Sequence, residues 1–166
     1  GFKSITKNST TGAITVEAVY DTRPNFRTTI DNATFNTGGA VTDTLTIDES
    51  GTLFNVDGTG NIVVNMPALS TANVGTTYEF LVTTAVGSGK TVIFVLPGSA
   101  VSNFYGALSL MGGTAANPAS DVAGDTLTLV NSTVVNSRVS LTCVADDATN
   151  STWKAEALAS PIATIA

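Results

Sequence analysis

Apolar and polar residues alternate with a period of two along most of the chain. Successive side chains of a β-strand point to opposite faces of its sheet, so this alternation is typical of strands with one buried side. The predicted buried side comprises Ile14, Val16, Ala18, Tyr20, Val41, Leu45, Ile47, Phe54, Val56, Ile62, Val64, Met66, Tyr78, Phe80, Val82, Leu127, Leu129 and Trp153. Cys143 shares the parity of Val139 and Leu141, so we expect a small buried side chain there rather than a reactive thiol.

Turn residues and prolines separate these alternating runs. Asp57–Gly60 and Gly87–Gly89 are predicted to be hairpin loops, because Gly and Asp favour the backbone angles of tight turns. Asp146–Asn150 separates the last two predicted strands in the same manner. Pro67 and Pro97 each close a strand, where the missing N–H is least costly.

Two segments depart from simple alternation. Val92–Leu96 is apolar at every position, which predicts a central strand. Gly112–Gly124 is the longest irregular stretch and is predicted to be an exposed loop. No segment of the sequence carries a convincing helical stripe. About nine or ten short strands at this spacing predict an all-β fold, either a β-sandwich or a jelly roll.

Composition limits the chemistry that the chain can perform. Thr, Ser, Asn and Gly supply 70 of the 166 residues, and only 12% are charged, about half of the usual share. The absence of His excludes imidazole as a catalytic base or a metal ligand. A single Cys excludes an internal disulfide. The net charge of −6 argues against nucleic acid as the main partner, because phosphate binding needs clustered Lys and Arg.

Charge is also unevenly distributed along the chain. Residues 1–34 contain four basic and three acidic residues, a net charge of +1, whereas residues 35–166 contain three and ten, a net charge of −7. We therefore predict an N-terminal arm with one or two strands at 1–37, a β-sandwich body at 38–158 and a C-terminal tail at 159–166. No apolar run is long enough to predict a membrane span, and we expect no signal peptide in residues 1–10.

Several motifs resemble functional sites but are better explained by turns. Gly87–Thr91 ends like a phosphate-binding loop, yet Thr84 stands where that motif needs Gly, and a strand follows where it needs a helix. The adjacent carboxylates Asp48–Glu49 and Asp146–Asp147 would point to opposite faces of a strand, so neither pair forms an acid–base dyad. We predict no enzyme activity, cofactor or metal. A glycosidase with carboxylates from distant strands and a structural cation near Asp57–Asn61 remain alternatives.

The predicted arm carries the candidate binding residues. They combine aromatic and basic side chains, the composition that protein interfaces prefer, and they are Phe2, Lys3, Lys7, Arg23, Phe26 and Arg27. The alternative is that they are surface side chains of an extra strand. The body, by contrast, has few charges and much Thr, Ala and Val. A surface of this kind is usually covered by another copy or by a partner.

Three segments of the chain resemble a known protein family. Asp48–Phe54, Ile62–Pro67 and Gly75–Val82 form a strand, a second strand that ends in Met-Pro, and a Gly-x-x-Tyr-x-Phe run. This order, which spans near a third of the chain, resembles β-rich virion proteins of tailed bacteriophages, namely capsid decoration (cement) proteins and related head-fibre modules. The resemblance implies a homotrimeric β-sandwich at the local three-fold positions of an icosahedral capsid. It carries over no individual binding residue.

We therefore expect a structural virion protein on the outer surface of a phage capsid. Its partners would be the major capsid protein and copies of itself, with neither nucleic acid nor membrane involved. The arm residues would be its capsid contacts. The alternative is a carbohydrate-binding or adhesin-like β-sandwich, such as a fibre knob or surface module. That alternative predicts an exposed row of aromatics for stacking on sugars, for which Phe104 and Tyr105 are the available candidates.

Overall fold

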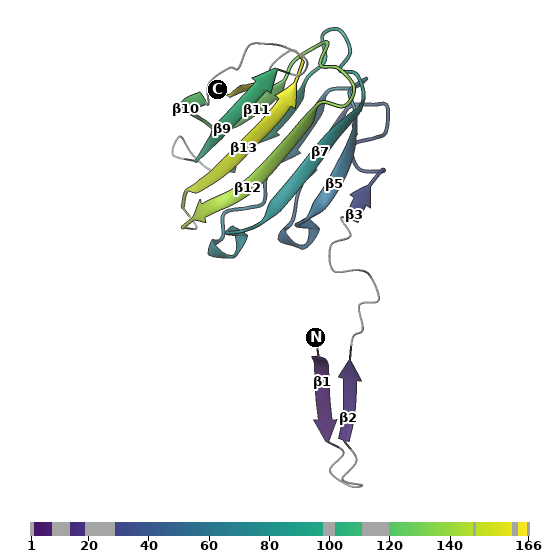
Figure 1. Ribbon diagram of the computed structural model, residues 1–166, viewed down its shortest axis with the longest axis vertical. Coiled ribbons are helices and arrows are strands. Elements are labelled where there is room, and N and C mark those ends of the chain that lie inside the picture. Colours follow the sequence, from purple (N-terminus) through teal and green to yellow (C-terminus); the bar gives the residue numbers. More distant parts are fainter. Residues whose placement is uncertain are drawn as a thin grey trace.

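Two sheets packed face to face confirm the predicted β-sandwich (Figure 1). The computed structural model describes residues 2–7, 14–18, 29–97, 102–110, 120–147, 149–160 and 163–165. The seven-stranded sheet, in the order β10-β9-β13-β12-β7-β5-β3, comprises β3 (Thr29–Asp31), β5 (Thr52–Asp57), β7 (Thr77–Thr84), β9 (Asn103–Leu110), β10 (Ser120–Gly124), β12 (Arg138–Asp146) and β13 (Ser151–Ala159). The five-stranded sheet, in the order β14-β11-β8-β6-β4, comprises β4 (Val41–Thr44), β6 (Ile62–Asn65), β8 (Val92–Val95), β11 (Thr126–Leu129) and β14 (Thr164–Ile165).

Two smaller features lie outside these sheets. β1 (Phe2–Lys7) and β2 (Ile14–Ala18) form a separate antiparallel pair. The helices of the described ranges are two short 3₁₀ turns, η1 (Ile47–Glu49) and η2 (Thr71–Asn73). No helix in this part of the chain has the length and apolar character needed to cross a membrane.

From β3 to β8 the chain crosses between the sheets after every strand. It therefore winds as three stacked coils, β3–β4, β5–β6 and β7–β8. Successive coils pair in parallel, with β3 beside β5 and β5 beside β7 in one sheet. In the other sheet β4 lies beside β6 and β6 beside β8. A jelly roll is built from antiparallel strands, so of the two predicted architectures the sandwich is the one observed.

The coil topology corrects two predicted hairpins. Asp57–Gly60 and Gly87–Gly89 each connect strands of opposite sheets, and those strands do not pair with one another. The glycines of the first corner, Gly58 and Gly60, allow one coil to stack closely on the next, whereas Gly89 of the second corner has a positive φ of 69° and open space around it. An added Cβ on Gly60 would lie only 1.9 Å from the carbonyl oxygen of Gly39 in the preceding coil. Close backbone approach, rather than hairpin geometry, is the reason for Gly at this position.

The remaining strands pair mainly antiparallel. β12 pairs with β7 and β13, and Asp146–Asn150 forms the predicted hairpin turn between β12 and β13. Part of the loop predicted at Gly112–Gly124 is wrong, because Ser120–Gly124 is the edge strand β10 beside β9. Backbone pairing with β9 outweighs the weak local strand preference of this Gly- and Ala-containing segment. Residues 111–119 lie outside the described part.

The inward-facing positions of both sheets form one core, and most of the predicted buried side chains within the described ranges belong to it. Phe80 of one sheet meets Phe94 of the other, with ring centroids 4.7 Å apart. Cys143 is buried, as expected. Ile47 is 42% exposed, contrary to prediction, because the chain leaves β4 and turns into η1 before reaching it.

The sheets extend beyond the predicted limits of the body. β3 and the fully buried Phe35 fall within the predicted arm at 1–37, yet both belong to the sandwich. The buried Ala163 and strand β14 likewise fall within the predicted tail at 159–166. The division of the chain into an arm, a body and a tail stays a prediction.

Candidate functional site

Three of the six predicted contact residues lie on the separate β1–β2 pair, outside the two packed sheets. Phe2, Lys3 and Lys7 lie on β1, whose register places Ile5 opposite Val16 of β2. The other three lie outside the described residues, and they are Arg23, Phe26 and Arg27. Their role as capsid contacts stays a prediction. The described surface instead offers two candidate binding faces, one on each sheet.

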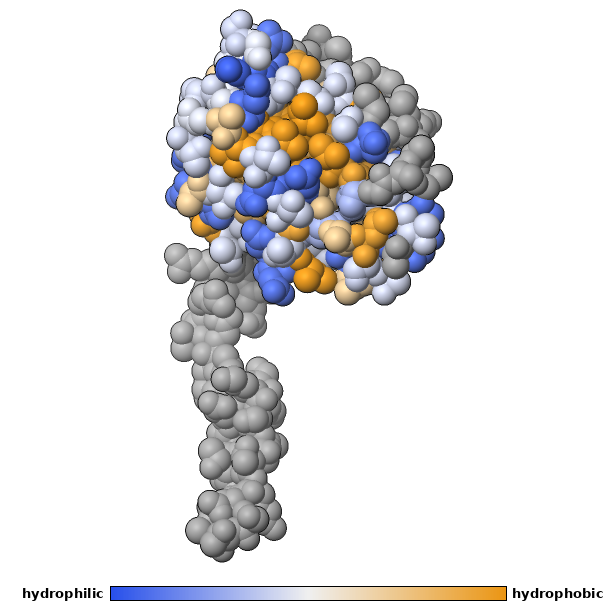
Figure 2. All heavy atoms as spheres, turned by 180° about the vertical axis from the view of Figure 1, so that it is seen from behind, coloured by the Kyte–Doolittle hydropathy of each residue, from blue (hydrophilic) through white to orange (hydrophobic). Residues whose placement is uncertain are grey.

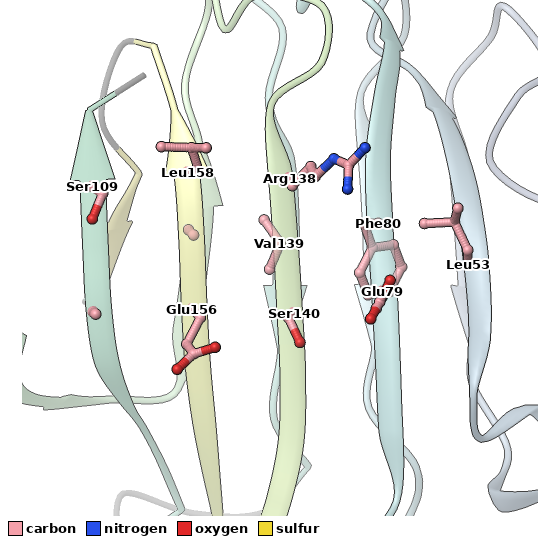
Figure 3. A pocket seen from close by; sticks show the side chains of 11 residues that line it. Leu53, Glu79, Phe80, Ser109, Arg138, Val139, Ser140, Glu156 and Leu158 are labelled. Atoms are coloured by element: carbon pink, nitrogen blue, oxygen red, sulfur yellow. The ribbon is translucent and has the colours of Figure 1, made fainter. Parts of the chain in front are cut away.

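The first face is a groove that crosses five strands of the seven-stranded sheet (Figure 3). We call it the sheet groove; its volume is about 490 Å³. Its lining comes from β5, β7, β12, β13 and β9, and comprises Leu53, Glu79, Phe80, Ala107, Ser109, Arg138, Val139, Ser140, Glu156, Ala157 and Leu158. The register aligns its outward residues in rows across the strands. Ser140 lies opposite both Glu79 and Glu156, and Arg138 opposite both Leu81 and Leu158.

Among the described residues, two of the four outward charged side chains on the central strands β7, β12 and β13 lack an ion-pair partner. Lys154 and Glu156 bind each other, with Nζ and Oε1 2.7 Å apart. The hydrogen bond and the charge of Glu156 raise the pKa of Lys154 above its usual value. Arg138 and Glu79 are both exposed and make no ion pair within the described ranges. Figure 3 shows the guanidinium of Arg138 extending toward β7.

Apolar side chains are also exposed on this face. Eight large hydrophobic side chains are exposed in the described part of the chain, and four of them lie on strands of the seven-stranded sheet, namely Ile30, Tyr105, Val144 and Leu158. Of the two aromatics that the sugar-binding alternative requires, Phe104 is buried and only Tyr105 is exposed. Strand parity explains the difference, because neighbouring residues of β9 point to opposite faces.

The second face lies on the five-stranded sheet and carries no charged side chain. We call it the uncharged face. Its outward residues lie in register across five strands, and they are Thr42, Thr44, Val63, Asn65, Ile93, Val95, Thr126, Thr128 and Thr164. Figure 2, which views the molecule from this side, shows apolar surface gathered near the centre of the sandwich. This arrangement can bind a surface by apolar contact and hydroxyl hydrogen bonds, without charge pairing.

Three of the carboxylates considered above as possible catalytic groups accept hydrogen bonds that hold turns and loops in place. Glu49 accepts hydrogen bonds from the backbone N and the hydroxyl of Thr46, both at 2.7 Å. Asp146 is buried and accepts from the backbone N of Ser70 at 3.1 Å and from Asn73 Nδ2 at 3.0 Å. Asp147 accepts from two backbone N–H groups of its own turn. No cluster of three or more Cys, Asp or Glu suited to a metal occurs in the described ranges.

The apparent phosphate loop is a corner between the sheets. Gly87–Thr91 connects β7 to β8, so the segment after Lys90 is a strand of the five-stranded sheet. There is no helix N-terminus to hold a phosphate at this point of the described chain.

Neither the sheet groove nor the uncharged face was predicted from the sequence. The alternation of apolar and polar residues predicts which side chains point outward, and it places Glu79 outward between the predicted core residues Tyr78 and Phe80. The sequence pattern does not predict that β7 and β12 are neighbours, and this pairing is what brings Glu79 and Arg138 together.

Comparisons of the chain with family models, with curated proteins and with solved structures find no match.

Proposed function

We propose that this chain is a non-enzymatic structural protein of a tailed-phage virion. It binds the outer surface of the capsid as a homotrimer and stabilises the shell by bridging neighbouring major capsid proteins. The observation that carries the proposal is the uncharged face. A chain with a net charge of −6 keeps every charge off the outward side of one whole sheet, and a surface of that kind is suited to being covered.

The mechanism is attachment through several modest contacts. The uncharged face supplies one contact per subunit, and the basic and aromatic arm residues supply a second against an acidic shell. Three-fold symmetry then multiplies these contacts, because each subunit that binds raises the effective concentration of the next. No single interface needs to be strong.

A test of this mechanism compares two charge-introducing variants. Ile93→Asp places a carboxylate on the uncharged face, whereas Ser88→Asp places the same charge on the exposed corner between β7 and β8. Each variant is sedimented with empty capsids of the phage whose genome encodes the chain. We expect Ile93→Asp to lose roughly tenfold or more in affinity, since an unpaired charge at a covered site is strongly unfavourable, and Ser88→Asp to bind like the parent. Equal binding by both variants would exclude the uncharged face as a capsid contact.

The second candidate function is binding of a glycan in the sheet groove. One observation favours it: Tyr105 is exposed beside a groove that also contains hydroxyl and carboxylate groups. A single exposed aromatic is a weak platform for sugar stacking, so capsid binding remains the better supported function. A glycan array that gives hits lost in Tyr105→Ala would reverse this order.

A further inference from the structure

The outward side chains on the central strands of the seven-stranded sheet carry no net charge, while Asp57 at the end of the neighbouring β5 adds one acidic group. The three central strands β7, β12 and β13 present two acidic and two basic outward side chains, Glu79, Glu156, Arg138 and Lys154. This balance is unusual for a chain with a net charge of −6. Two copies that approach through these central strands therefore meet little net repulsion.

The unpaired charges of this face are also complementary to each other. Lys154 and Glu156 already bind each other within one copy. Arg138 and Glu79 have opposite signs, are both exposed and lack ion pairs in the described part of the chain. The register places them on adjacent strands, one row apart. A second copy of the same face therefore offers each of them the partner that it lacks.

The apolar side chains of the face supply the other part of an interface. Leu158 lies directly opposite Arg138 in the register, and Leu81 lies on the other side of Arg138. The aliphatic stem of an Arg can pack between two such side chains while its guanidinium reaches a carboxylate. This combination of a central Arg with apolar neighbours is typical of the residues that dominate protein interfaces.

The face is large enough to form part of a subunit contact. Five neighbouring strands about 4.8 Å apart, over about eight residues of about 3.3 Å each, present roughly 600 Å². A specific interface buries about 800 Å² on each partner. In a ring of three copies the face is shared between two neighbours, so it supplies part of each interface and the loops at its margin supply the rest.

We propose that the outer face of the seven-stranded sheet, centred on the sheet groove, binds other copies of this chain. In a trimer each face turns toward the three-fold axis, so Arg138 of one copy meets Glu79 of the next, as the head-to-tail contacts of a ring require. This inference rests on the homotrimer in the proposed function, but not on capsid binding. It leaves the uncharged face on the opposite side free for a partner.

The experiment measures the oligomeric state of the purified chain without capsids, by sedimentation velocity and mass photometry across micromolar concentrations. Leu158→Asp tests the face, and Val135→Asp is its matched control. Both side chains are 42% exposed, and Val135 lies in the loop between β11 and β12. We expect Leu158→Asp to weaken the trimer roughly tenfold or more and Val135→Asp to leave it unchanged. Fluorescence of the buried Trp153 verifies that each variant is folded.

A charge exchange tests the predicted pair itself. Arg138→Glu alone and Glu79→Arg alone each place like charges together, so both should weaken the trimer. The double variant restores opposite charges and should recover most of the parent's association. A monomeric parent, a Leu158→Asp trimer as stable as the Val135→Asp control, or a double variant no better than the single ones would overturn the inference. A trimer that behaves as expected but ignores capsids would leave this inference standing and remove the proposed function.

Discussion

Replacing Gly60 by Ala tests the stacked-coil arrangement most sharply. The added Cβ would lie 1.9 Å from the carbonyl oxygen and 2.2 Å from the carbonyl carbon of Gly39, and an ordinary contact needs at least 3.4 Å. Both atoms are backbone, so the coils must separate. That separation lengthens the adjacent hydrogen bond from Val41 N to Asn61 O, now 3.0 Å. Overpacking costs about 1–3 kcal/mol and the lost hydrogen bond about 1 kcal/mol, so we expect a loss of about 2–4 kcal/mol of unfolding free energy.

The assay is urea unfolding followed by the fluorescence of Trp153, the single and fully buried tryptophan. A loss of this size lowers the midpoint by roughly 1–2 M at an ordinary m-value. Gly39→Ala is the matched control from the other side of the same contact. Its Cβ would meet only Thr37 Oγ1 at 3.9 Å, so it should unfold close to the parent. If Gly60→Ala and Gly39→Ala unfold at the same midpoint, the coils do not stack as described.

Two further substitutions test the core. Tyr78→Phe removes the hydrogen bond that Tyr78 Oη donates to the carbonyl oxygen of Thr46 at 2.7 Å, and we expect urea unfolding to show a loss of about 1 kcal/mol. Burial, followed by the charge of Asp146, raises the pKa of the Cys143 thiol to about 11. The folded chain therefore keeps a proton that the unfolded chain releases above about pH 8.5. The contribution of this thiol to the free energy of unfolding is fully present below that pH and is lost as the pH rises toward 11. Thermal unfolding between pH 8 and 11 should show a shallower decline for Cys143→Ala, and an unchanged decline would assign the effect to other groups.

The core was predictable because strand parity is a local property. Phe54, Phe80 and Trp153 each stand in a run of alternating residues, and two consecutive residues of a strand necessarily face opposite sides. The prediction for Ile47 is wrong because parity applies only within a strand, and β4 ends at Thr44, before this residue. Predictions of this kind hold as far as the strand continues.

The coil topology and the sheet groove were not predictable in this way. Gly60 is a turn residue in either a hairpin or a corner between sheets, and only the position of Gly39, 21 residues earlier, distinguishes the two. Arg138 and Glu79 lie far apart in the sequence and become neighbours because β12 pairs with β7. Which strands become neighbours depends on the free energy of the whole sandwich, and no single run of residues carries that information.

The most direct test of the proposed function is a binding titration on empty capsids of a tailed phage whose genome carries this sequence. Labelled protein is added to a fixed amount of capsid, and bound copies are counted after sedimentation. We expect saturable binding in the micromolar range or tighter, with three copies bound at each local three-fold position. Absence of saturable binding at micromolar concentrations, or saturation at a number unrelated to the three-fold positions, would contradict the proposed function.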